Sequence, residues 1–116
     1  MLDVSPAEFD EVVGEALDGV PPELTRLMDN VAIFVEEEPP ADHPNLLGWY
    51  HGTPLTERGW SYAGVLPDRI VVFRRPLLRM CSSRDELVDE VRITVVHEIA
   101  HHFGIDDERL HELGYG

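Results

Sequence analysis

The sequence contains little of what marks secreted or membrane proteins. Cys81 is the single cysteine among 116 residues, which excludes an intrachain disulfide and suits a reducing compartment. No stretch approaches the roughly 18 consecutive apolar residues that a membrane span requires. The segment from Met1 to Ser5 lacks the basic and apolar regions of a signal peptide. We therefore expect a cytoplasmic protein that does not interact with membranes.

Positive charge is also scarce. Nine basic residues face 23 acidic ones, and the formal net charge is −14. This charge would repel phosphates, so it argues against nucleic acid as a partner. It favours a basic substrate or partner, although solubility is the simpler explanation. The chain has no repeat, linker or low-complexity tract, so we expect residues 1–116 to form one domain with one modest core.

The most informative motif is the pair His97 and His101. On a helix a spacing of four places both imidazoles on one face, one turn apart, where they can bind one Zn²⁺. Glu98 lies about 60° round the helix from His101, where it can take a proton from a metal-bound water without being a ligand. Gly104 can adopt a positive φ and end the helix. Either Asp106 or Asp107 can then supply a third, oxygen ligand.

Two other residues with reactive side chains fit a structural role better. His102 lies about 140° round the helix from His97, so we expect it to pack or to face solvent rather than bind metal. Cys81 is better explained as a small buried hydrophobic residue than as a reactive thiol.

The hydrophobic pattern predicts helices at both ends of a run of strands. Ser5 and Ser83 each begin a capping box, and apolar residues at helical spacing follow both of them. The second of these helices carries an apolar stripe from Leu87 to Phe103. We expect helices over 6–18, 22–29, 84–103 and 107–113, a helical turn over 76–80, and strands over 31–35, 46–51 and 69–74, the first strand being buried on both faces. The predicted class is α+β, with the histidine helix packed across a small mixed sheet of about three strands.

The motif and its surroundings resemble the zincin metallopeptidases. The pattern His-Glu-x-x-His-x-x-Gly-x-x-Asp over residues 97–107 looks like the aspartate variant of the metzincin signature. The segments 52–59 and 93–116 resemble a family of small bacterial proteins, the minimal zincin-like metallopeptidases. This resemblance implies a zincin-like fold, His97, His101 and Asp107 as zinc ligands, and Glu98 as the general base.

The function that follows is a zinc-dependent metallopeptidase of narrow specificity. Its expected substrate is a peptide or protein, preferably basic, and a protein partner would complete or regulate the cleft. Two alternatives remain: a non-catalytic metal-binding module that retains the site, and a metal-dependent hydrolase of a small molecule. The last methionine is Met80, so the Met-turn of true metzincins is missing, and this supports the non-catalytic module.

Other parts of the sequence leave their roles open. The segment 52–64 is either a connecting loop or, by the resemblance, part of a groove where a peptide adds to a strand. Trp49, Tyr50 and Trp60 can line such a groove or belong to the core. Tyr115 and His111 are candidates for stabilising an oxyanion.

Overall fold

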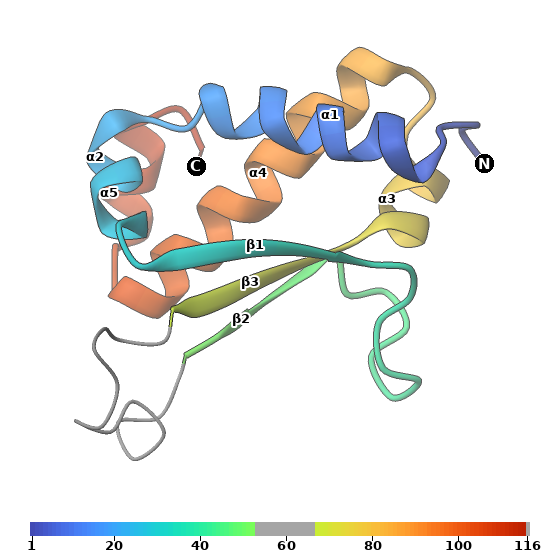
Figure 1. The fold of residues 1–116 in the computed structure, drawn as a ribbon. Helices are drawn as coiled ribbons and strands as arrows, with labels where there is room; N and C mark the ends of the chain where they lie inside the picture. Colours follow the sequence, from blue (N-terminus) through green and yellow to red (C-terminus); the bar gives the residue numbers. More distant parts are fainter. Residues whose placement is uncertain (53–66, 116) are drawn as a thin grey trace.

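A computed structural model describes residues 1–52 and 67–115 (Figure 1). Its helices lie on one face of a three-stranded sheet, and α4 runs across that face beneath α1. This arrangement confirms the predicted α+β class. In chain order the elements are α1 (Pro6–Asp18), α2 (Pro22–Thr25), the 3₁₀ turn η1 (Arg26–Met28), β1 (Val31–Glu36), β2 (Gly48–His51), β3 (Asp68–Phe73), α3 (Arg74–Met80), α4 (Arg84–Phe103) and α5 (Asp107–Glu112).

The sheet is mixed, and β2 forms one edge of it within the described residues. The strand order is β1-β3-β2, with β1 parallel and β2 antiparallel to β3. The Phe73 amide donates to the Leu47 carbonyl at 2.9 Å, which sets the phase of the antiparallel ladder. Trp49 and His51 then direct their backbone groups toward β3, whereas Gly48 and Tyr50 direct theirs away from it.

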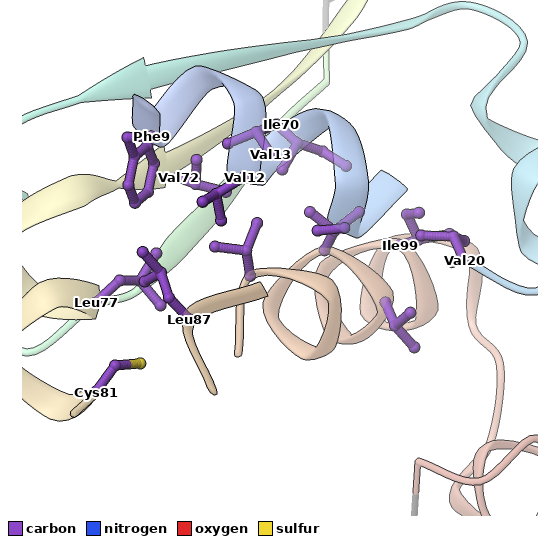
Figure 2. Packing of buried hydrophobic residues seen from close by; sticks show 14 of the residues in the cluster. Phe9, Val12, Val13, Val20, Ile70, Val72, Leu77, Cys81, Leu87 and Ile99 are labelled. Atoms are coloured by element: carbon purple, nitrogen blue, oxygen red, sulfur yellow. The ribbon is translucent and has the colours of Figure 1, made fainter. Parts of the chain in front are cut away.

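The core lies between the sheet and the two long helices (Figure 2). Fully buried side chains come from α1, β3 and α4, with Phe9, Ile70 and Ile99 among the largest. Cys81 belongs to the same cluster, as the sequence predicted. Its burial raises the pKa of the thiol to about 11, which disfavours the nucleophilic thiolate at neutral pH.

Two predictions about burial were wrong. Strand β1 is not buried on both faces: Ile33 packs against the core, but Phe34 on the opposite face is 48% exposed. Side chains alternate between the two faces of a strand, and the described helices cover only the face that carries Ile33 (Figure 1). A continuous apolar run does not reveal that the other face is uncovered. Phe103 is not the end of a buried stripe and is 41% exposed, because α4 extends past the core at its last turn.

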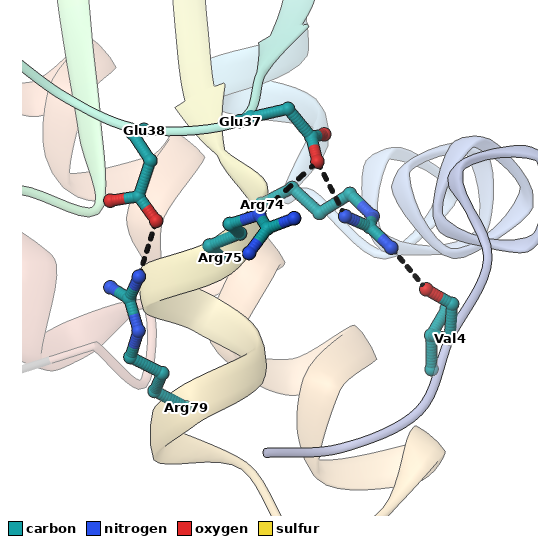
Figure 3. A network of polar contacts seen from close by, with 6 residues as sticks. All are labelled: Val4, Glu37, Glu38, Arg74, Arg75 and Arg79. Atoms are coloured by element: carbon teal, nitrogen blue, oxygen red, sulfur yellow. Dashed lines mark hydrogen bonds and ion pairs between the residues drawn. The ribbon is translucent and has the colours of Figure 1, made fainter.

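Glu37 and Glu38, which directly follow β1, form ion pairs with arginines of α3 (Figure 3). The Arg74 guanidinium donates to Glu37 at 2.7 Å and to the Val4 carbonyl at 2.6 Å, and Arg79 pairs with Glu38. Arg74 is the most enclosed of these groups, so its contacts are the least screened by water. The network ties the N-terminal segment, the end of β1 and α3 together.

No helix in the described residues is long and apolar enough to cross a membrane.

Candidate active site

Helix α4 carries the motif, and both of its ends are capped. The Ser83 hydroxyl accepts from the Glu86 amide at 3.1 Å, as the capping box predicts. At the other end Gly104 has φ +69°, and the Ile105 amide donates to the Ala100 carbonyl at 2.9 Å. This left-handed residue stops the helix one turn beyond the histidines.

His97 and His101 lie together as their spacing predicts. Their ring centroids are 6.5 Å apart, and the ring planes differ by 19°. Both rings therefore project from one side of α4 in nearly the same orientation. Two parallel imidazoles one helical turn apart offer two nitrogen donors to a single ion.

Glu98 lies beside the histidine pair and is hydrogen-bonded to β2. Its Oε1 accepts a hydrogen bond of 3.1 Å from the backbone amide of Tyr50. Burial raises the pKa of the Glu98 carboxyl above its ordinary value, while the Tyr50 amide and the two imidazoles act in the opposite direction. A carboxylate whose pKa is raised accepts a proton more readily, as a general base must.

The predicted third ligand is not gathered with the histidines. Asp107 is exposed in the first turn of α5, and within the described residues no three His, Cys, Asp or Glu side chains are placed to hold a metal ion. Asp106 has another role, because its Oδ1 caps α5 by accepting from the Arg109 amide at 2.8 Å. This cap makes Asp106 the poorer candidate and leaves Asp107 as the prediction.

Residues 113–115 lie next to His97 and line a cavity together with it. The Tyr115 carbonyl oxygen lies 3.3 Å from His97 Nε2, and the Tyr115 hydroxyl accepts from Arg92 at 2.9 Å. A carbonyl can only accept, so this contact requires a proton on Nε2 and competes with metal binding there. Tyr115 was an oxyanion candidate, but in this conformation its hydroxyl is engaged by Arg92. His111, the other candidate, is exposed on α5.

The donor chemistry at α4 fits Zn²⁺ at two positions. Imidazole nitrogens are good zinc donors, and a neighbouring carboxylate that is not itself a ligand suits a catalytic site. A third ligand from Asp107 would require the connection between Gly104 and α5 to bring that carboxylate to the histidine pair, because the described residues hold no group of three such donors. The site is thus suited to zinc by residue type and only partly preorganised.

A shallow cavity of about 250 Å³ lies beside Glu98. Its lining includes Gly48 and Trp49 of β2 and His43 and Leu46 of the preceding segment. Trp49 therefore borders this cavity, whereas the Tyr50 ring packs on His102 at a centroid distance of 3.8 Å. Trp60 and most of the segment 52–64 lie outside the described residues.

Comparison with known proteins agrees with this fold. The model of the zincin-like metallopeptidase family matches residues 28–116, and the chain belongs to that family. A solved structure of a conserved hypothetical protein from T. thermophilus is similar, with a TM-score of 0.56 and 24% sequence identity over 86% of this chain and 94% of that one. This second likeness shows the fold alone. No curated protein matches the chain.

The choice between the two aspartates gives a test of the third ligand. We expect Asp107→Ala to weaken zinc binding about tenfold or more, because it removes a ligand, and Asp106→Ala to weaken it much less. Asp106→Ala should instead destabilise α5 by about 1 kcal/mol through loss of its cap. Titration against a chromogenic chelator, with thermal unfolding of both variants, measures the two effects. A larger loss of affinity in Asp106→Ala would refute the assignment.

Proposed function

We propose that the protein is a zinc-dependent metallopeptidase of narrow specificity. His97, His101 and Asp107 would hold the metal, and Glu98 would serve as general base. The observation that carries this proposal is the arrangement on α4, with two parallel imidazoles 6.5 Å apart and the adjacent carboxylate held at the edge of the sheet. Membership of the zincin-like metallopeptidase family supports the reaction class.

In the proposed reaction the carboxylate moves the proton. A Zn²⁺ ion at this position would polarise the scissile carbonyl and activate the attacking water. Glu98 takes a proton from that water and delivers it to the leaving amine. The pKa of Glu98, raised by burial, favours the first transfer, and the Tyr50 amide keeps Oε1 in place.

The substrate we propose is one extended peptide segment. Strand β2 is an edge strand of the described sheet, and the outward-facing backbone of Gly48 borders the cavity that Glu98 also lines. An extended segment that pairs with such an edge brings its backbone close to the carboxylate. The net charge of −14 favours a basic segment. A protein partner that completes the shallow cavity would restrict cleavage further.

A lysate experiment tests this function. Zinc-loaded wild type and Glu98→Gln are each incubated with a cytosolic lysate, and new N-termini are identified by mass spectrometry. We expect a few termini that depend on wild type, with their formation reduced at least about 100-fold by Glu98→Gln, which keeps the shape and the metal ligands but removes the base. Generic substrates such as casein should be cleaved little or not at all.

Three other outcomes would count against the proposal. Identical termini with both proteins, each with zinc bound, would refute peptidase activity. Brisk digestion of casein would refute narrow specificity. Hydrolysis of small esters or amides without any new protein termini would point to a small-molecule hydrolase.

A second candidate function is a metal-binding interaction module without catalysis. The absence of a third donor beside His97 and His101 in the described residues favours it, and so does the Tyr115 carbonyl at His97 Nε2. This module would bind zinc only when its partner reorganises residues 104–115. A pull-down from the same lysate distinguishes this function. Immobilised zinc-loaded wild type should retain one specific partner that His97→Ala does not retain.

A further inference from the structure

Strand β2 and helix α4 run side by side with matched spacing. A Cβ at Gly48 would lie 2.6 Å from Thr94 Cγ2, the Tyr50 amide binds Glu98, and a Cβ at Gly52 would lie 3.4 Å from His102 Cε1. Every second residue of a strand advances about 6.6 Å, and every fourth residue of a helix advances about 6 Å. Alternate residues of β2 and every fourth residue of α4 therefore stay opposite each other along these segments. Positions 48, 50 and 52 therefore lie over positions 94, 98 and 102.

Tyr50 is the residue that contacts two successive positions of this helical row. Its backbone amide donates to Glu98 Oε1 at 3.1 Å. Its ring stacks on His102, with centroids 3.8 Å apart and planes 12° from parallel. Because Glu98 and His102 are four residues apart, one strand residue is fixed to α4 through both its backbone and its side chain.

Asp68 contacts both rings of the Tyr50–His102 stack. The Tyr50 hydroxyl donates to Asp68 Oδ2 at 2.8 Å, and His102 Nε2 lies 3.9 Å from the same oxygen. Asp68 begins β3, the strand that pairs with β2. Phe103 closes one side, with its ring edge-on to His102 at 4.9 Å. The strand pair and the last turn of α4 are thus joined at one polar cluster.

We propose that Tyr50, supported by Asp68 and His102, is the positioning residue for Glu98. The ring and the hydroxyl fix the lateral position of β2 on α4, and this position brings the Tyr50 amide to the carboxylate. His102 acts through Tyr50 and not as a metal ligand. The catalytic consequence rests on the proposed function, but the positioning itself is a property of the folded chain.

Residue-specific amide hydrogen exchange, followed by NMR on the full chain, tests the positioning without any substrate. The Trp49 amide faces β3 and serves as an internal reference. We expect Glu98→Ala to speed exchange of the Tyr50 amide about tenfold or more relative to Trp49, because its acceptor is gone. Glu98→Gln, which retains an acceptor oxygen, should preserve most of the protection.

The same measurement on His102 variants tests the support. His102→Ala should speed Tyr50 exchange severalfold relative to Trp49, and His102→Phe, which keeps a stacking ring, should restore it. His51→Ala is the matched control, because it removes a ring from the opposite face of the same strand, and it should leave Tyr50 protected. Unchanged Tyr50 exchange in both Glu98→Ala and His102→Ala, or equal acceleration of Tyr50 and Trp49, would overturn the proposal.

Activity gives a second readout that separates the two proposals. If Glu98-dependent cleavage is found in the lysate, His102→Ala should lower kcat about tenfold with little change in KM, and normal kcat would overturn the positioning role. If no such cleavage is found, the proposed function fails. The exchange experiment then decides the positioning role alone.

Discussion

His97→Ala and His101→Ala should each purify without bound zinc, whereas His102→Ala should retain about one ion per chain. In the proposed site the two parallel rings on one side of α4 would supply the nitrogen donors. Each single substitution would leave at most one imidazole and one carboxylate as ligands. Loss of one ligand from so small a set should reduce the affinity at least about 100-fold. Elemental analysis of protein prepared without chelator measures the zinc content directly.

His102→Ala is the informative control because it removes a histidine from the same helical turn. Its ring lies flat on Tyr50, and its Nε2 lies 3.9 Å from Asp68. Circular dichroism of the three variants distinguishes loss of metal from loss of fold. Equal zinc loss in all three would show that the ligands have been assigned to the wrong histidines.

Gly48→Ala should destabilise the fold by about 1–3 kcal/mol. A Cβ at this position would lie 2.6 Å from Thr94 Cγ2 and 3.2 Å from the Val71 carbonyl oxygen. Thr94 is branched at Cβ and its hydroxyl is bound to the Glu90 carbonyl at 2.8 Å, so it has little freedom to turn aside. The strand must move away from the helix, and the free energy of unfolding, measured in urea, should fall.

Two further variants make this result specific. Thr94→Ser in the Gly48→Ala background removes the clashing methyl and keeps the hydroxyl, so it should recover part of the loss. Gly14→Ala in α1 is the matched glycine control, since a Cβ there meets nothing within 4 Å. It should raise the free energy of unfolding by about 0.5–1 kcal/mol through helix propensity. Similar losses in Gly48→Ala and Gly14→Ala would contradict the close-approach argument.

Much of this fold follows from local patterns in the sequence. The capping residues Ser5 and Ser83 begin their helices as expected, and the glycine at 104 ends α4. These features depend on contacts between residues close in sequence, so spacing alone predicts them. The strands were also placed correctly to within two residues at each end, and α3 begins two residues before the predicted turn.

The parts that the sequence did not predict depend on contacts between distant segments. The Tyr50 amide is a backbone group, so no residue type identifies it as the partner of Glu98; only the register of β2 on α4 does so. His102 was expected to pack or to face solvent, and nothing in its helical position indicated that its stacking partner would be Tyr50 of a distant strand. The position of Asp107 likewise depends on how α5 folds back, and the assignment of that residue as a ligand stays a prediction.

The turn at Gly104 restricts the backbone conformation of the residue at this position but not the size of its side chain. Its φ is +69°, yet a Cβ built there meets nothing within 4 Å. An L-residue would therefore meet no neighbouring atom here. Its only penalty would be the strain of placing its own Cβ on a backbone with positive φ. The mirror-image residue, D-alanine, would adopt this φ without strain and would reduce the freedom of the unfolded chain. Because ribosomal synthesis supplies no D-residues, glycine is the encoded residue that adopts this conformation with the least strain.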